Sequence, residues 1–331
     1  MVRNPGTVTT SPRSLGRRQV LRDLAHHDLR RHRARRRVLL AAAAAVLLLA
    51  AGSSGLRSGG GPLSADVAPH ESTPGVAYAI GERSSEAEVA PTGLAVAATA
   101  AVDELVVPMP GTTLGVAVAD RATGERAIGR TGAEPFYSAS LVKIIMAVDV
   151  LQRRHAGLPV SPTDLKLLRR ALGPSDDEAM NLLWVRFDGP EAVARVARQL
   201  GLRETHPPAD PSQWGETVVS ARDIVTVYRH VLDGMPAADR ELITAALATA
   251  PATAADGFDQ AFGLAPLSGA KSKQGWMCCP DGHIQLHSAG TLGEQQRFVV
   301  ALLSSIPADR GYDAGRGTVT AAAGTVRATL R

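Results

Sequence analysis

A serine and a lysine three residues apart are the first pair of side chains in this sequence that could do chemistry. Ser140-Leu141-Val142-Lys143 opens a stretch that we expect to be helical. Positions i and i+3 share one helix face, so the Ser140 hydroxyl and the Lys143 amine can meet. A serine becomes a nucleophile when a base takes its proton, and a desolvated lysine can be that base. The tetrapeptide fits serine acyl transfer, and it also fits a helix cap followed by a surface lysine.

Two further short motifs add a second hydroxyl and a second amine. The Ser-Asp-Asp motif at 175–177 lies in a predicted turn before a helix. Ser175 and Glu178 also have the spacing of a capping box, which would explain both residues without chemistry. The Lys-Gln-Gly motif at 273–275 lies on a predicted strand, where the lysine can face a cleft and the glycine lets a substrate approach the backbone. An edge-strand lysine is the alternative for this third motif.

The elements that must position these motifs follow from the hydrophobic pattern. Residues 94–106 form a predicted helix, and 113–119 form a strand that a turn at 120–124 leads into a second extended stretch. The pattern is helical between 140 and 247. The predicted helices in this block are 141–151, 162–172, 190–200 and 220–232, the last with Ser220 and Asp223 in capping-box spacing. The pattern then predicts three antiparallel strands and a closing helix, at 271–279, 284–289, 297–304 and 318–330.

This order of elements predicts an α+β fold. One antiparallel sheet would be built from both ends of the domain and flanked by its N- and C-terminal helices, with an all-helical insertion at about 138–250. A crevice between two such lobes is a usual place for an active site. All three motifs lie where this crevice is expected.

Together, the three motifs resemble the active-site signature of the penicillin-recognising serine hydrolases, with class A β-lactamases the nearest group. The family patterns are S-x-x-K, S-D-N and K-T-G, in that order. The resemblance covers roughly residues 94–331, and Asn181-Leu182-Leu183 stands where the family tends to carry Asn-Leu-Leu. Three motifs in the right order on the right elements are far more specific than any one of them. The resemblance implies a β-lactamase or transpeptidase-like fold and acyl transfer through a serine ester.

The resemblance also implies a role for each motif residue. Ser140 would be the nucleophile, Lys143 the base and Ser175 a proton shuttle. Lys273 would be the cation that holds a substrate carboxylate. The oxyanion would lie between the backbone N–H groups of Ser140 and Trp276. The remaining motif positions would contact the substrate; these are Asp177, Gln274 and Gly275. No cofactor and no metal is implied.

Two departures from the family pattern bear on activity. The S-D-N motif ends in Asp177, whose carboxylate would favour the charged form of a nearby lysine and repel a substrate carboxylate. The Glu-x-x-Leu-Asn segment, whose glutamate directs the hydrolytic water in class A β-lactamases, has no counterpart between Gly201 and Ser220; Glu204 is the nearest substitute. An acyl-enzyme would then be long-lived, as in penicillin-binding proteins.

The basic charge of the chain is concentrated at its N-terminal end. Residues 1–37 hold eleven Arg against two Asp, a net +9, and subtracting this from the total of +4 leaves −5 for the rest. This partition argues against a nucleic-acid-binding domain, which would carry its basic patch on the folded module. The apolar run 38–51 follows the arginines and fits an export signal or an uncleaved anchor. We therefore expect a basic export segment at 1–51, a linker at 52–92 and the hydrolase-like domain at 93–331.

The chain has two cysteines, Cys278 and Cys279, which are adjacent and cannot by themselves form a four-ligand zinc site. A vicinal disulfide and two buried thiols both fit an exported protein. His287 lies on a predicted strand, and this mechanism asks for no imidazole.

The function most consistent with these residues is that of an exported, monomeric serine hydrolase acting on a β-lactam or a D-alanyl cell-wall peptide through a Ser140 acyl-enzyme. The alternative is a catalytically impaired module of the same fold that binds peptidoglycan or a protein partner. Membrane contact is expected only through the N-terminal segment, with a secreted or cell-envelope location.

Overall fold

The computed structural model describes residues 92–106 and 109–331. The predicted export segment and nearly all of the predicted linker lie outside these residues. No helix among the described residues is long and apolar enough to cross a membrane.

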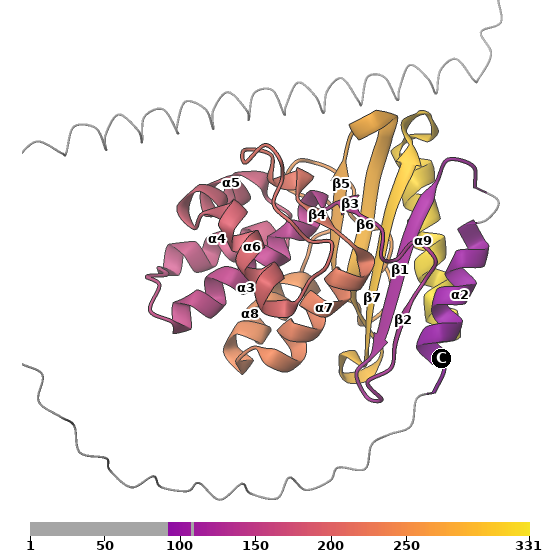
Figure 1. Cartoon of the computed structure of the whole chain (residues 1–331), viewed down its shortest axis with the longest axis horizontal. Coiled ribbons are helices and arrows are strands. Elements are labelled where there is room, and N and C mark those ends of the chain that lie inside the picture. Colours follow the sequence, from indigo (N-terminus) through magenta and orange to yellow (C-terminus); the bar gives the residue numbers. More distant parts are fainter. Residues whose placement is uncertain (1–91, 107–108) are drawn as a thin grey trace, which may run out of the picture. The chain divides into compact units, whose positions relative to one another are not determined.

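An antiparallel sheet of five strands forms the centre of the described domain (Figure 1). Its spatial order is β2-β1-β7-β6-β5, with β5 at one edge. The strands are β1 (Thr113–Asp120), β2 (Arg126–Ile128), β5 (Lys271–Met277), β6 (His283–Leu292) and β7 (Phe298–Pro307). Early strands thus pair with late ones, as in the register Ala117 to Ala301. The predicted α+β fold, with one sheet built from both ends of the domain, is confirmed.

The two faces of the sheet belong to two separate cores. Successive strand residues point to opposite faces. On β1, Val116 and Val118 pack with the terminal helices, whereas Ala117 and Ala119 pack with the helical lobe. The terminal helices α2 (Leu94–Val106) and α9 (Gly311–Thr329) cover the first face together (Figure 1). This two-sided burial explains why β1 and β7 are apolar along nearly their whole length.

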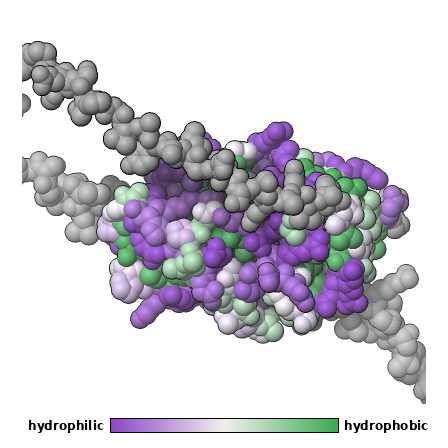
Figure 2. All heavy atoms as spheres, turned by 90° about the horizontal axis from the view of Figure 1, so that it is seen from below, coloured by the Kyte–Doolittle hydropathy of each residue, from purple (hydrophilic) through white to green (hydrophobic). Residues whose placement is uncertain are grey.

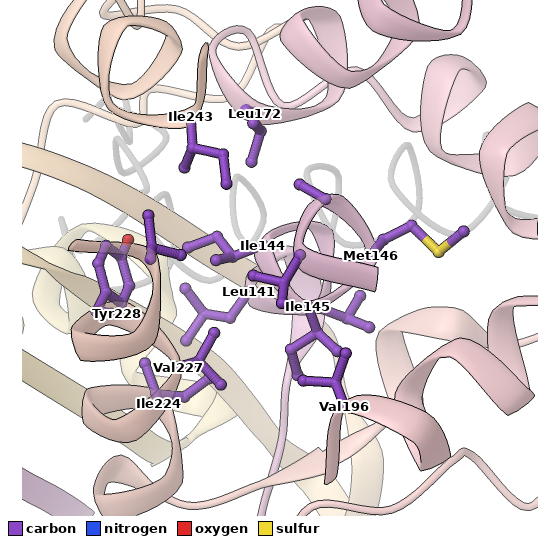
Figure 3. Close-up of a cluster of buried hydrophobic side chains, with 14 of the residues drawn as sticks. Leu141, Ile144, Ile145, Met146, Leu172, Val196, Ile224, Val227, Tyr228 and Ile243 are labelled. Carbon is purple, nitrogen blue, oxygen red and sulfur yellow. The ribbon is translucent and has the colours of Figure 1, made fainter. Parts of the chain in front are cut away.

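The helical lobe on the other face is organised around α3 (Val142–His155), whose residues from Val142 to Leu151 are all buried. Figure 3 shows this core: Ile144 and Ile145 of α3 lie among Leu172, Tyr228 and other side chains of the surrounding helices. The surrounding helices are α4 (Pro162–Leu172), α5 (Asp177–Arg186), α6 (Gly189–Leu200), α7 (Ala221–Arg229) and α8 (Ala237–Ala248). A helix enclosed on every side holds its first turn, next to Ser140, in a fixed place.

Several element boundaries differ from the predictions, and glycines account for the largest difference. Helix α9 begins at Gly311, not at 318, and its first turns are rich in glycine. A Cβ on Gly315 would lie 2.4 Å from the Leu286 side chain, so this glycine allows close packing of the helix on the sheet. Strands β6 and β7 extend beyond their predicted ends, whereas β5 stops at Met277.

The predicted capping box at the start of α7 is half formed. Ser220 accepts a hydrogen bond from the Asp223 N–H. The Asp223 carboxylate instead accepts from the backbone N–H groups of Arg203, Glu204 and Thr205. It therefore anchors the loop that precedes α7, because that loop offers three donors to one buried acceptor.

The surface mixes hydrophilic and apolar residues on the face drawn in Figure 2. Beyond β5, Cys278 and Cys279 are joined in a disulfide. A buried thiol pair, the alternative interpretation of these residues, is not what the structure contains.

We expect Gly290→Ala to loosen the pairing of β5 with β6. A Cβ at this position would lie 2.4 Å from the Lys271 carbonyl oxygen and 2.7 Å from the Ser272 Cα, so the strands must separate. Overpacking of this kind lowers the free energy of unfolding by about 1–3 kcal/mol, measurable by urea denaturation. The control is Gly324→Ala on α9, where a Cβ meets nothing within 4 Å and no loss is expected. Equal stabilities of the two variants would contradict this packing.

Candidate active site

The candidate nucleophile lies in a short turn between two elements. Strand β3 (Phe136–Tyr137) pairs with β4 (Val218–Val219), and the 3-10 turn η1 (Ala139–Leu141) follows and leads into α3. Ser140 is only 4% exposed. Its neighbour Ala139 has φ +45°, a left-handed conformation that costs energy for a residue with a Cβ. Such strain is concentrated at functional sites, where the surrounding structure must maintain it.

Lys143 lies at the centre of a polar cluster inside the protein. Its Nζ is 3.0 Å from the Ser140 Oγ, as the helical spacing predicts. It also lies 2.8 Å from the Ser175 carbonyl oxygen, 3.2 Å from the Ser175 Oγ and 2.7 Å from the Asp177 Oδ1. Lys143 is 1% exposed, whereas the Asp177 side chain is 54% exposed. The buried ammonium therefore has a carboxylate partner that reaches solvent.

Ser175 is available for chemistry because its neighbour caps the helix. The N-cap of α5 is Asp176, whose carboxylate accepts from the backbone N–H groups of Glu178 and Ala179. The capping-box interpretation of Ser175 with Glu178 is therefore wrong. The Ser175 hydroxyl instead lies 2.8 Å from the Lys273 Nζ and 3.2 Å from the Lys143 Nζ. One hydroxyl thus bridges the two amines.

Lys273 reaches the cluster from the edge strand β5. Its Nζ contacts the Ser175 Oγ and the Gln274 carbonyl oxygen, each at 2.8 Å. The side chain is 1% exposed. Burial, and then the charge of Lys143, hold the pKa of Lys273 well below its usual value. The structure therefore brings Ser140, Lys143, Ser175 and Lys273 together from three distant stretches of the chain.

The other motif residues of β5 divide between its two faces. A Cβ on Gly275 would lie 3.1 Å from the Ser138 carbonyl oxygen, so this strand passes directly beside the turn that holds Ser140. The Trp276 indole stacks on Phe258 in the core below the sheet. The Gln274 amide donates to the Ser272 Oγ, and both line a different cavity, so this amide does not face Ser140.

His287 supports the turn from beneath as a neutral imidazole. Its Nε2 lies 2.7 Å from the Tyr137 carbonyl oxygen, and its Nδ1 accepts from the Ser304 N–H. Burial lowers the pKa of His287 to about 4. The side chain therefore positions the strand before Ser140 and takes no part in the amine cluster.

The loop between α6 and α7 adds a residue that sequence reasoning missed. Its 3-10 turn η2 (Trp214–Glu216) lies against η1. The Trp214 ring lies over the Lys143 Nζ at 4.9 Å, and its indole N–H donates to the Asn181 Oδ1 at 2.8 Å. Glu204 of the same loop pairs with Arg222 at 3.5 Å. Within the described residues, the part of this loop that lies over the Lys143 amine is the Trp214 indole. The Glu204 carboxylate, the nearest substitute for the family's glutamate, pairs with Arg222 instead.

Comparison with known proteins places the chain in a family. No protein-family model matches it. It is 36% identical over 223 residues to proteins named "Putative lipoprotein LppW" from Mycobacterium bovis and Mycobacterium tuberculosis, across 65% of this chain and 70% of theirs. The chain belongs to the LppW family.

Solved structures similar to this LppW-family chain share its fold. A class A β-lactamase from Mycobacterium abscessus matches with a TM-score of 0.56 and 19% identity, over 70% of this chain and 99% of that one. PBP-A matches with a TM-score of 0.58 and 18% identity, over 73% and 97%. A PBP-A mutant, solved as an acyl-enzyme complex with penicillin G, matches with a TM-score of 0.57 and 18% identity, over 73% and 98%. The β-lactamase-like fold of the LppW-family chain is thereby established.

The described residues of this LppW-family chain contain no group of three or more His, Cys, Asp or Glu side chains arranged to hold a metal ion. The amines at the candidate site are those of Lys143 and Lys273.

The buried imidazole predicts a loss of stability in mild acid. The folded pKa of His287 is about 4, against 6.5 for a free imidazole, so the unfolded chain binds the proton more tightly. Stability is therefore fully present above about pH 6.5 and falls as the pH drops towards 4, by up to about 1.4 kcal/mol per pH unit. Urea denaturation of wild type and His287→Gln across this range measures the slope. The variant should have a shallower slope, because its amide does not titrate, and an unchanged slope would contradict this role of the buried imidazole.

Proposed function

We propose that this chain is a serine acyl-transfer hydrolase that acts through a Ser140 acyl-enzyme on a β-lactam or a D-alanyl cell-wall peptide. One observation carries the proposal: the Ser140 hydroxyl lies 3.0 Å from a buried lysine that is linked through Ser175 to a second buried lysine. Such a cluster can remove a proton from a serine without an imidazole.

The attack on an acyl donor follows from the arrangement of η1 and β5. The Ser140 Oγ forms the new ester bond while its proton passes into the lysine cluster. The backbone N–H groups of Ser140 and Trp276 would stabilise the oxyanion, because β5 passes beside the turn that holds Ser140. Loss of one such donor typically costs about 3–4 kcal/mol of transition-state stabilisation. The leaving group then takes a proton from the cluster through Ser175.

Release of the acyl group by water should be slow. Hydrolysis of the ester needs a base that activates a water molecule next to it. Trp214 lies over Lys143 on the side where the loop passes, and Glu204 pairs with Arg222 instead. This arrangement supports a persistent acyl-enzyme, and so a transfer or penicillin-binding activity more than rapid antibiotic hydrolysis.

The alternative function is a module of the same fold that binds peptidoglycan or a protein partner without turnover. The ion pair between Lys143 and Asp177 at 2.7 Å favours it, because it stabilises the charged form of the lysine nearest Ser140. The name of LppW as a lipoprotein and the apolar run 38–51 of this chain support an envelope location.

A covalent adduct on Ser140 tests the proposal. We expect a fluorescent penicillin or an activated ester to label the full chain, and the label to persist over many minutes. Ser140→Ala should abolish labelling, because no other oxygen replaces its Oγ. Ser138→Ala is the matched control, since it removes a buried hydroxyl two residues away that donates to the Ala139 carbonyl oxygen and does not contact the lysines. Intact-mass spectrometry locates the adduct, and the absence of any adduct across several acyl donors would favour the binding module.

Asp177→Asn should raise the rate of acylation by the fluorescent penicillin. The substitution removes the carboxylate 2.7 Å from the Lys143 Nζ, and it removes a negative charge that would repel the carboxylate of the penicillin. Glu178→Gln provides the control, since it removes an equal charge from the next position of α5. An acylation rate that stays unchanged or falls in Asp177→Asn would show that the Asp177 carboxylate does not slow acylation.

A further inference from the structure

The two buried lysines have unequal surroundings. Lys143 Nζ has four oxygen acceptors within 3.2 Å, and one of them is a carboxylate. An ammonium has three N–H donors, so each N–H of a charged Lys143 finds an acceptor in this environment. Lys273 Nζ has two acceptors in the described structure, a hydroxyl and a peptide carbonyl, and neither is charged. Burying a charge without an opposite partner is costly.

The charged and titratable groups around Lys273 also favour its neutral form over its charged form. From α3 the Lys143 ammonium disfavours a second positive charge, and Asp177 and Asp256 act on Lys273 in the opposite direction more weakly. From α7 the Tyr228 hydroxyl donates to the carbonyl oxygen of Ala289, the residue paired with Lys273 on β6. Burial raises the pKa of Tyr228, so this hydroxyl adds no charge.

We propose that Lys273, not Lys143, is the final acceptor of the proton that leaves Ser140, and that Lys143 and Ser175 relay it. This proposal rests on the acyl-transfer function proposed above and assigns its base. It reverses the roles that the family resemblance implies, in which the first lysine is the base and the second holds a substrate carboxylate.

The relay conserves every proton and charge. Lys143 first gives one of its own protons to the Ser175 Oγ at 3.2 Å, while the Ser175 hydroxyl proton passes to the Lys273 Nζ at 2.8 Å. The neutral amine that this leaves on Lys143 takes the proton of the Ser140 Oγ, 3.0 Å away, as that oxygen bonds to the acyl carbon. Lys143 is an ammonium paired with Asp177 before and after the step. The net result is a new charge on Lys273, balanced by the oxyanion.

The low lysine content of the chain allows a direct test by NMR. The chain has four lysines, at 143, 166, 271 and 273. Lys166→Arg with Lys271→Arg, both outside the candidate site, leaves two signals in protein labelled at the lysine side chain. The Lys143 signal is identified by its displacement in Asp177→Asn. We expect the other signal, from Lys273, to lose its proton at the lower pH, and the acylation rate to rise with pH through the same midpoint.

An arginine at position 273 distinguishes a lysine that accepts the proton from one that only holds a substrate carboxylate. Arg keeps the charge but cannot release its proton at working pH. If Lys273 accepts the proton, Lys273→Arg should lower the acylation rate by about 10²–10⁴-fold and remove the rise with pH. If Lys273 only holds a carboxylate, Lys273→Arg should keep most of the rate and the whole pH profile. Circular dichroism of each variant checks that the fold is retained.

Two results would overturn the proposal while leaving acyl transfer intact. One is a Lys143 signal that titrates below that of Lys273, and the other is a Lys273→Arg variant with the wild-type pH profile. Failure of Ser140 to form any adduct would instead overturn the proposed function. The NMR titration needs no substrate, so it decides the protonation order of the two lysines in either case.

Discussion

The site depends on one electrostatic constraint: two lysine amines lie inside the protein and share a single hydroxyl. Two adjacent ammonium ions in a region of low dielectric constant repel each other strongly, so the cluster favours one charge over two. The Asp177 carboxylate contacts Lys143 and is half exposed to solvent, so the opposite charge within contact distance lies beside this lysine.

The fold supplies the rigidity that this arrangement needs. Helix α3 is buried along its first ten residues, so Lys143 cannot turn its amine to solvent without disturbing the core. Strand β5 is fixed to β6 over its full length, which sets the position of Lys273. Asp176 satisfies the first N–H groups of α5 and so leaves the Ser175 hydroxyl to the lysines. Three ordinary structural devices, a core helix, a strand ladder and a helix cap, together bring the cluster to within hydrogen-bond distance.

Much of this arrangement could be predicted from the sequence because it depends on local periodicity. The i, i+3 spacing of Ser140 and Lys143 and the alternation along β1 are patterns that the backbone geometry imposes. Other features depend on contacts between distant residues. The capping-box spacing of Ser175 and Glu178 predicted the wrong cap, because the Ser175 hydroxyl contacts the two lysines and Asp176 caps the helix instead. Trp214 could have been noticed as a large aromatic residue in a proline-rich loop, but its neighbour Lys143 lies 71 positions earlier.

The disulfide after β5 differs from most protein cross-links in what it encloses. In the chain-entropy account, a cross-link stabilises a fold by closing a loop of chain, more for longer loops, and a bond between adjacent residues closes almost none. Cys278 and Cys279 therefore tie no distant segments together. Their bond stiffens a short stretch of backbone at the exit of the strand that carries Lys273, next to the core on the side of the terminal helices.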